Sequence, residues 1–223
     1  MIRLNEIRGL KYPDEFVTRY FFKEQFHQRR GRVLELGCGN GNNLMLFYQH
    51  GWDVVGIDIN EQALDEAEHN FQGIGEEDTK WLFRQLDLGQ GLPKIDGLFG
   101  SFDVVLMPSV LYYIPRSAMI SCLARVFDLL APGGSFFLRM RAIGDYRYGR
   151  GRQVERNGFV LEISETGEYG LINVFYHQYE LVDMLREHLQ AKMDSLKVLQ
   201  LSFDNIQNDV LVTNQEVVIW GKV

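Results

Sequence analysis

Short apolar runs alternate along the chain with stretches whose apolar residues recur at helical spacing. The runs predict buried strands, and they are RVLELG (32–37), DVVGIDI (53–59), KWLFRQLDL (80–88), FDVVLMP (102–108) and SFFLRMR (135–141). The helical stretches are NNLMLFYQHG (42–51), EQALDEAEHNF (61–71) and RSAMISCLARVFDLL (116–130). This alternation is typical of an α/β fold, and it predicts a doubly wound, mostly parallel sheet with helices on both faces.

The pattern changes toward both ends of the chain. Residues 12–28 predict an amphipathic helix whose aromatic face covers the sheet. Residues 142–158 show no clean period, so we expect a long loop or small insertion there, before a helix over 181–189. Two final runs, 195–205 and 209–223, predict an antiparallel pair of strands at one sheet edge.

These segments predict one domain, because a chain of 223 residues buries one substantial core but not two. We expect four parts within it. They are an N-terminal helical cap (1–31), a cofactor-binding half (32–141), a substrate-side insertion or lid (142–178), and a C-terminal helix and strand pair (179–223).

The composition of the chain limits the kinds of partner and the cellular compartment that we expect for it. The net charge of −7 argues against a surface that binds nucleic acid through clustered Lys and Arg. No run approaches the roughly eighteen apolar residues that a membrane span needs, and the N-terminus lacks the features of a signal peptide. Cys38 and Cys122 do not form a disulfide pattern. We therefore expect a cytoplasmic protein without a membrane partner.

The first predicted strand ends in a glycine-rich turn that is suited to a ligand. Gly37, Gly39 and Gly41 occupy every second position, and a helix follows them directly. Such a turn presents backbone N–H groups and the positive end of a helix dipole to one point. Asp58 ends the second strand about 20 residues later, where an acid accepts hydrogen bonds from ribose hydroxyls. Together the turn and the acid predict an adenosine-type cofactor.

Two details distinguish the possible cofactors. A dinucleotide fingerprint requires a third glycine at position 42, where this chain has Asn42. Glu35 lies two residues before the first glycine, and its carboxylate would repel a pyrophosphate but attract a cation. S-adenosylmethionine carries both an ammonium and a sulfonium, so it fits this turn better than NAD does.

Residues 33–44 resemble the first motif of the class I S-adenosylmethionine-dependent methyltransferases, an acidic residue followed after one position by G-x-G-x-G. The resemblance continues in order through four further stretches: GIDIN (56–60), RQLDL (84–88), FDVVLMPSVLYYIP (102–115) and LLAPGGSFFL (129–138). It implies a Rossmann-like, seven-stranded, mostly parallel sheet whose last strand runs antiparallel.

The resemblance also implies a set of cofactor-binding residues. They are Glu35, Gly37, Cys38, Gly39, Gly41, Asn43, Asp58, Ile59, Asp87, Leu88 and Met107. The glycines would face the methionine moiety, Asp58 the ribose and Asp87 the adenine amino group, with the adenine between Ile59 and Leu88. Cys38 is interpreted as a small residue in a crowded loop, without thiol chemistry.

The acceptor is expected at the carboxyl ends of the strands, above Met107–Tyr113 and the segment after Arg141. Many family members have two histidines where this chain has Tyr112 and Tyr113, so the most obvious base is absent and the catalytic residue stays unassigned. The arginines and tyrosines of 139–152 suggest a lid for an anionic small molecule, although an ordinary solvated loop is the alternative. The predicted substrate residues are Tyr112, Arg141, Tyr146, Arg147 and Tyr148.

The sequence therefore predicts an enzyme that methylates a small molecule and leaves S-adenosylhomocysteine as the product. The histidines show no metal-ligand spacing, so no metal is expected; His177 is the one we single out as an acid or base, against a capping role. The alternatives are an RNA methyltransferase, a non-catalytic S-adenosylmethionine-binding regulatory module and, least favoured, a dehydrogenase. Either a monomer or a homodimer is compatible with the sequence.

Overall fold

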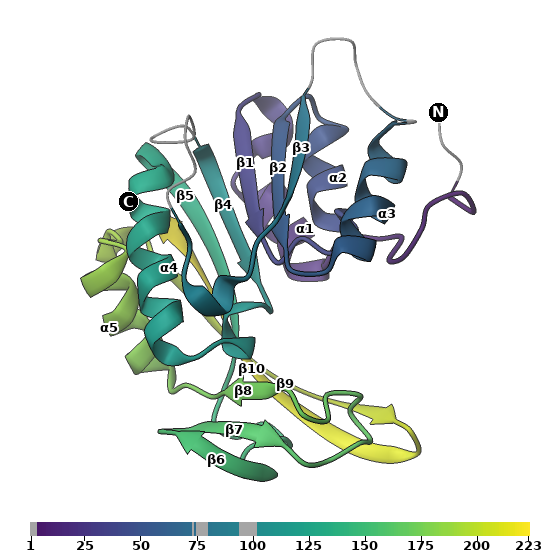
Figure 1. Ribbon diagram of the computed structural model, residues 1–223. Helices are drawn as coiled ribbons and strands as arrows, with labels where there is room; N and C mark the ends of the chain where they lie inside the picture. The colour runs from purple at the N-terminus through teal and green to yellow at the C-terminus, as the bar shows by residue number, and fades with distance from the viewer. Residues whose placement is uncertain (1–3, 73, 75–79, 94–101) are drawn as a thin grey trace. The chain divides into compact units, whose positions relative to one another are not determined.

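The computed structural model describes residues 4–72, 74, 80–93 and 102–223 of the chain (Figure 1). Residue contacts divide the chain into two compact units. The first comprises Met1–Asp87, Lys94–Pro108 and Asp128–Phe137; the second comprises Leu88–Pro93, Ser109–Phe127 and Leu138–Val223. Each unit is described by itself below. The single domain and the four parts expected from the sequence stay a prediction.

A seven-stranded sheet has the hydrogen-bonded order β3-β2-β1-β4-β5-β10-β9. Its strands are β1 (Arg32–Leu36), β2 (Asp53–Asp58), β3 (Trp81–Gln85), β4 (Phe102–Pro108), β5 (Leu130–Arg141), β9 (Lys197–Gln207) and β10 (Val210–Lys222). The β1–β2, β1–β4 and β2–β3 pairs are parallel, whereas β10 and β9 are antiparallel. The predicted fold class, a Rossmann-like α/β sheet with antiparallel strands at its end, is thus confirmed.

Two helices cover one face of β1, β2 and β3 in the first unit (Figure 1). They are α2 (Asn42–Tyr48) and α3 (Glu61–Gln72), close to the bounds that their apolar spacing predicts. Helix α3 starts at Asn60, whose side chain accepts the Ala63 N–H at 3.2 Å, as a capping residue does. Both helices therefore begin directly after a strand, and their first turns lie at the carboxyl edge of the sheet.

The N-terminal helix is shorter than the 12–28 segment predicted. It is α1 (Glu15–Lys23), and the Asp14 carboxylate caps it by accepting two backbone N–H groups of its first turn. The chain then turns through Gln25, whose φ of 57° is left-handed, into a 3₁₀ turn, η1 (Phe26–Gln28). The prediction of one continuous helix is wrong because a residue in this conformation ends the helical hydrogen-bond ladder.

The aromatic face of α1 is buried, as predicted. Phe21 packs edge-on against Phe47 of α2, with ring centroids 4.7 Å apart. Tyr20 lies 5.4 Å from Phe137 of β5 between ring centroids. These contacts join α1 to both a helix and a strand of the first unit, so this helix is part of its core.

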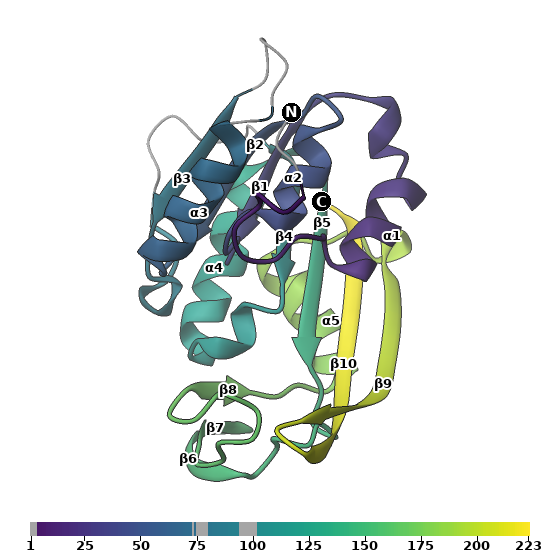
Figure 2. The same cartoon turned by 90° about the vertical axis from the view of Figure 1, so that its right-hand side faces the viewer.

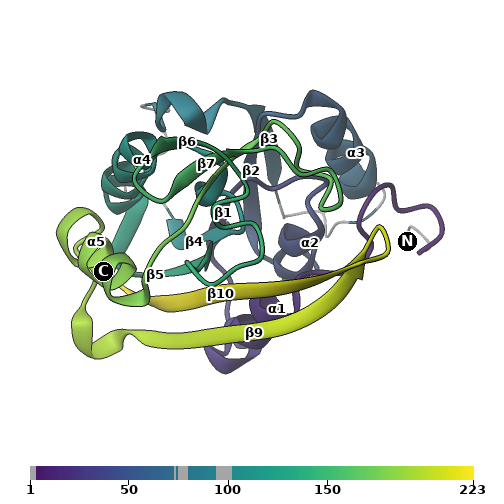
Figure 3. The ribbon, with the colours of Figure 1, turned by 90° about the horizontal axis from the view of Figure 1, so that it is seen from below.

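The second unit contains a small sheet that the sequence analysis did not predict. Residues 142–178 were expected to be a loop or lid, but they include three antiparallel strands, β6 (Gly151–Glu155), β7 (Gly158–Leu161) and β8 (Ile172–Val174), seen from below in Figure 3. The buried side chains of Phe159, Leu161 and Phe175 form its core. These strands are only three to five residues long, and β6 has no buried residue, which is why no local period revealed them.

The remaining helices are α4 (Arg116–Leu129) and α5 (Gln178–His188), with short 3₁₀ turns η2 (Leu88–Gln90), η3 (Leu111–Tyr113) and η4 (Met193–Ser195). Strands β9 and β10 form a long hairpin, shown in Figure 2. Its two turn residues, Asn208 and Asp209, have φ of 46° and 63°, the left-handed pair that a tight hairpin turn requires. The predicted antiparallel C-terminal pair is confirmed, and β9 forms one edge of the sheet.

The tight packing of β2 gives a first testable prediction. A Cβ atom on Gly56 would lie 2.6 Å from both Cys38 Sγ and the Phe83 ring. Gly56→Ala should lower the free energy of unfolding by about 1–3 kcal/mol through overpacking, as measured by urea denaturation. Gly133→Ala is the control, because a Cβ there meets no atom within 4 Å and only its φ of 76° opposes the substitution. A loss of less than about 1 kcal/mol in Gly56→Ala would contradict the packing argument.

Candidate functional site

The glycine-rich turn after β1 adopts the conformation that its sequence predicts. Gly37, Gly39 and Gly41 all have positive φ, of 72°, 51° and 76°. A Cβ on Gly39 would meet nothing within 4 Å, so the turn leaves open space on that side. A Cβ on Gly41 would lie 2.8 Å from the Phe71 ring, so this glycine is required by close packing against α3. One glycine therefore faces open space and another faces the core.

Asp58, at the carboxyl end of β2, is bonded to this turn. Its Oδ2 accepts the Gly39 N–H at 2.7 Å, and its Oδ1 accepts the Asn60 N–H at 2.9 Å. The two hydrogen bonds fix the carboxylate in one orientation at the edge of the first unit. Each carboxylate oxygen still has a lone pair for a further donor, such as a hydroxyl.

Glu35 is buried beneath the turn. It is 1% exposed, and its Oε1 accepts the Asn43 side-chain N–H at 2.7 Å. Burial raises the pKa of Glu35 to about 8, while the Asn43 bond opposes that shift. Its Oε2 is buried and has no hydrogen-bond partner among the described residues. A buried carboxylate oxygen without a donor suits a site that receives a cationic ligand group.

A second layer of contacts, not foreseen from the sequence, holds residues 8–14 against the turn. We name these residues the N-terminal strap. Asn40 donates to two strap carbonyls at 2.6 and 2.8 Å, and Asn42 donates to a third at 2.8 Å. Asn70 of α3 binds both the N–H and the carbonyl of Arg8, at 2.9 and 3.1 Å. Asn43 accepts the Asp14 N–H at 2.7 Å.

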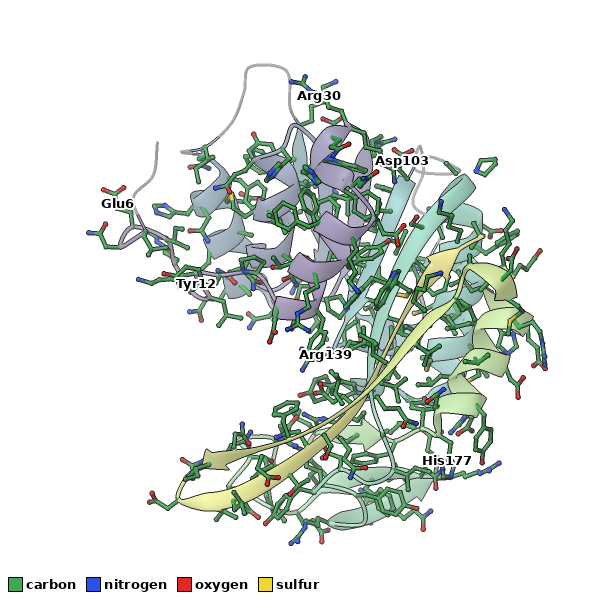
Figure 4. All side chains as sticks on the ribbon, turned by 180° about the vertical axis from the view of Figure 1, so that it is seen from behind. Glu6, Tyr12, Arg30, Asp103, Arg139 and His177 are labelled. Atoms are coloured by element: carbon green, nitrogen blue, oxygen red, sulfur yellow. The ribbon has the colours of Figure 1, made fainter. Side chains whose placement is uncertain are left out.

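The strap therefore lies along the ligand turn within the first unit. Leu10 and Tyr12 are each 68% exposed, and Figure 4 shows Tyr12 on this segment. The signal that could have located the strap is the NGNN sequence of the turn (40–43), since asparagines bind backbone groups well. Their partners, however, are about 30 residues away in sequence, and no local pattern reveals them.

The other residues implied for the cofactor have varied surroundings. Ile59 is 61% exposed directly after Asp58, and Asp87 is exposed shortly after β3. Met107 is fully buried in β4, and Leu88 belongs to the second unit, where it is buried. Ile59 is thus an apolar side chain at the surface beside the turn. The proposed packing of an adenine between Ile59 and Leu88 stays a prediction.

Cys38 is buried within the glycine turn. Burial raises the pKa of its thiol well above the ordinary value, with the nearby carboxylates of Glu35 and Asp58 adding to the shift. The thiol is therefore protonated at neutral pH and is not a nucleophile. Its Sγ contributes packing under Gly56, in keeping with the interpretation of a small residue in a crowded loop.

The second unit holds a buried network of charged groups around Glu168. This glutamate lies between β7 and β8, and it is 7% exposed. Arg141 Nη2 binds its Oε1 at 2.7 Å, Arg147 Nε binds its Oε2, and the Tyr113 hydroxyl donates to its Oε1. Burial alone would raise the pKa of Glu168, but Arg141 and Tyr113 outweigh that effect and lower it. The carboxylate is therefore ionised and bridges two guanidinium groups.

Further polar partners bind both arginines of this network. Arg147 Nη1 contacts Asp145 Oδ1 at 3.1 Å and Asn214 Oδ1 at 3.2 Å, and its Nη2 donates to Gln207. Arg141 donates to Asn173, and its guanidinium lies over the Tyr112 ring, 4.4 Å from the centroid. Because Glu168 and Asp145 balance the two positive charges, an anionic acceptor gains little attraction from these arginines.

The segment predicted as a hinged lid is tied to β10 by its backbone. The Ala142 N–H donates to the Gln215 carbonyl at 2.8 Å, and the Tyr146 N–H donates to the Thr213 carbonyl at 2.9 Å. Tyr146 donates its hydroxyl to Glu165 at 2.7 Å. Tyr148, by contrast, is 37% exposed, with its ring against Phe159 and Phe175. Of the five residues predicted to bind the acceptor, Tyr148 exposes the most side chain.

The tyrosines after β4 are not bases at neutral pH. Burial raises the pKa of Tyr112, and it raises the pKa of Tyr113 well above the ordinary value. His177, labelled in Figure 4, precedes α5 as its N-cap residue, yet its side chain makes no capping bond. Its ring stacks on that of Tyr179, with ring centroids 5.0 Å apart. Within the described residues, no group of three potential metal-ligating side chains comes together. None of the described helices has the length and apolar character to span a membrane.

Comparison with known proteins agrees with this geometry. Residues 34–136 match a family described as a methyltransferase domain. A ubiquinone biosynthesis O-methyltransferase from Dechloromonas aromatica is 32% identical over 108 residues, which cover 48% of this chain and 43% of that protein. A phosphatidylethanolamine N-methyltransferase from Cereibacter sphaeroides is 35% identical over 99 residues, covering 44% of this chain and 46% of that protein. The matched stretch therefore spans less than half the length of these curated relatives.

The likeness to solved structures extends over most of the chain. A methyltransferase from Methanosarcina mazei, described as dependent on S-adenosylmethionine, has a TM-score of 0.70 at 23% identity. The match covers 90% of this chain and 96% of that chain. The resemblance found in the sequence motifs is confirmed: residues 34–136 match a methyltransferase domain, and the fold is the one seen in S-adenosylmethionine-dependent methyltransferases.

The charge network of the second unit gives a testable prediction. Glu168→Ala leaves two buried guanidinium groups without their shared carboxylate, so the free energy of unfolding should fall by about 3–5 kcal/mol in urea denaturation. Glu162→Ala is the matched control, because Glu162 is exposed in the same segment. A Glu168→Ala variant as stable as the control would show that the network does not stabilise the unit.

Burial of Glu35 gives a second prediction, about pH. The pKa of Glu35 is raised from 4.5 to about 8 in the folded protein, so the folded state binds a proton that the unfolded state has released between those values. Wild-type stability should therefore fall relative to Glu35→Gln as pH rises through that range. Urea denaturation of both proteins across the range measures the difference, and a difference that is constant with pH would contradict it.

Proposed function

We propose that this chain transfers a methyl group from S-adenosylmethionine to a small-molecule acceptor. The observation that best supports this proposal is the arrangement of the glycine turn and two acidic residues at the carboxyl ends of β1 and β2. An open glycine turn is bonded there to Asp58 and lies above a buried carboxylate oxygen of Glu35 that has no donor. The match of residues 34–136 to a methyltransferase domain supports the same function.

The residues present fit this cofactor. Asp58 would accept the ribose hydroxyls, for which its two oriented oxygens retain lone pairs. The cationic methionine end would favour the ionised form of Glu35, whose carboxylate would then stabilise that charge, and Ile59 would offer an apolar surface to the adenine. Asp87 would accept a hydrogen bond from the adenine amino group, as the family resemblance implies. When bound, S-adenosylmethionine supplies a methyl group on a sulfonium, which is already activated toward a nucleophile.

The chain's own contribution to the transfer is alignment and exclusion of water. Neither Tyr112 nor Tyr113 is ionised near neutral pH, so neither serves as a general base. An acceptor that is already nucleophilic needs only to be held in line with the methyl group, which is itself a large part of the rate enhancement. The N-terminal strap, held by asparagines of the cofactor turn, would shield that end of the cofactor from solvent.

A small-molecule acceptor is supported by the relatives and by the charge of the chain. The two curated relatives are by name enzymes of ubiquinone biosynthesis and of phosphatidylethanolamine methylation. The net charge of −7 opposes a nucleic-acid acceptor. Tyr148 would contact the acceptor through its exposed ring, whereas Tyr112, Arg141 and Arg147 would support the site from within the buried network.

Asp58→Ala tests the cofactor assignment. Loss of a charged acceptor for the ribose hydroxyls should weaken binding of S-adenosylhomocysteine by about 10–100-fold, as measured by isothermal titration calorimetry. Asp65→Ala is the matched control, since Asp65 is an exposed acid on α3 in the same unit. Unchanged affinity in Asp58→Ala, or binding of NAD in place of S-adenosylhomocysteine by the parent, would refute the assignment.

Turnover is tested separately from binding. The purified chain is incubated with methyl-labelled S-adenosylmethionine and a metabolite extract, and a parallel incubation contains RNA. Label in a small-molecule fraction is the expected result, and label in RNA would point to the other acceptor class. Cofactor binding without label in either fraction would favour a regulatory module.

A further inference from the structure

We infer that the chain forms a twofold homodimer by antiparallel pairing of β9 with β9 of a second copy. Strand β9 is the last strand in the order of the sheet, and in the described part of the chain it pairs only with β10 (Figure 3). It is 11 residues long, and most of its residues are exposed. A strand of this length at an edge offers a row of backbone N–H and C=O groups to another strand.

The side chains of β9 do not protect this edge from pairing. Proteins usually block an exposed edge with proline, a bulge or charges along the strand. Here Lys197 and Asp204 are the two charged residues of β9, and the stretch between them, VLQLSF, has neither charge nor proline. The pairing of β9 with β10 runs in continuous register from Lys197 to Gln207, so no bulge interrupts it.

One face of β9 carries an apolar stripe of Leu199, Leu201 and Phe203. These residues alternate along the strand and so share a face. Leu199 is 36% exposed and Phe203 is 41% exposed, while Leu201 is half-buried. Solvent contact with three neighbouring large apolar side chains is unfavourable, and an added strand would cover them on that face.

The residue pattern of β9 favours a second copy of the same strand as the partner that pairs with this edge. In a twofold pair centred on Leu201, Leu201 lies opposite its own copy and Leu199 lies opposite Phe203 of the partner. Gln200 then faces Ser202 of the partner on the other side of the sheet. Between positions 199 and 203, each apolar side chain therefore lies opposite an apolar one, and each polar side chain lies opposite a polar one.

Neighbouring registers leave part of this stripe unmatched. Moving the centre by one residue to Gln200 places Lys197 opposite Phe203. Moving it to Ser202 places Leu199 opposite Asn205. The register centred on Leu201 is the one of the three that pairs Leu199, Leu201 and Phe203 entirely among themselves, so the stripe favours this register.

The first test is the oligomeric state of the full chain. Sedimentation velocity should show a dimer for the parent. Leu201→Lys puts two like charges opposite each other at the twofold axis, and it should raise the dimer dissociation constant by at least about tenfold. Leu211→Lys is the matched control, because Leu211 is an exposed leucine of the same hairpin on β10, and it should remain dimeric. A monomeric parent, or a Leu201→Lys variant that dimerises as the parent does, would overturn the inference.

A cross-linking test examines the register and does not depend on a destabilising charge. Residues directly opposite in an antiparallel pair have Cα atoms about 4.5–5.5 Å apart, within the range that a disulfide spans. Leu201→Cys should therefore form an intermolecular disulfide on mild oxidation. The native Cys38 and Cys122 are buried and do not compete.

The matched cysteine variants distinguish this register from any other contact. Two copies of Leu199→Cys would place their sulfurs roughly 13 Å apart along the strands, too far for a bond, so this variant should not cross-link with itself. Leu199→Cys mixed with Phe203→Cys should cross-link, because these positions are opposite. Self-cross-linking of Leu199→Cys as efficient as that of Leu201→Cys, or no cross-linking of Leu201→Cys, would overturn the inference.

Discussion

The hydrogen bond from the Gly39 N–H to Asp58 Oδ2 links the two strand ends that define the candidate cofactor site. It requires the turn after β1 to adopt a conformation that glycine favours, and it requires β2 to end level with that turn. The parallel β1–β2 pairing meets the second requirement, since Leu36 lies beside Ile57 and the next residue of each strand faces the same edge. Without this bond the carboxylate would be free to rotate toward solvent, and its orientation toward a sugar would have to be fixed during binding at an entropic cost.

The same turn also links the carboxylate of Asp58, at the edge of the sheet, to the buried carboxyl group of Glu35. Asn43 binds Glu35 with its amide N–H and the Asp14 backbone with its amide oxygen, so one side chain connects the cofactor turn, the buried acid and the start of α1. Asp58 is half-buried and bonded to backbone N–H groups, whereas Glu35 is fully enclosed and its pKa is raised. Two acids of similar chemistry are thereby given different tasks by their surroundings.

The sequence allowed the parallel strands, their helices and the glycine turn to be predicted, because each depends on local period and on residues that favour specific backbone angles. Asp58 could be located for the same reason, as the end of a strand with a regular apolar pattern. Glu168 could not be found this way. It lies in a polar loop, and its importance comes from Arg141 and Arg147, which are about 20–30 residues distant and meet it only in the folded unit. The β6–β8 sheet could not be predicted because its strands are short and β6 has no buried side chain to give an alternating pattern. The arginines of 139–152 are unusual for an acidic chain, but the sequence could not show that Arg139, Arg141 and Arg147 each bind a carboxylate.

The asparagines that hold the N-terminal strap bind its main chain and make no use of its side chains. The path of the strap is consequently independent of most of its own sequence. Substitutions at Leu10 or Tyr12 could accumulate during evolution without releasing the segment, while exchange of an anchoring asparagine would detach it. Such a segment can diversify in the side chains that it exposes while the glycine-rich turn beneath it is retained.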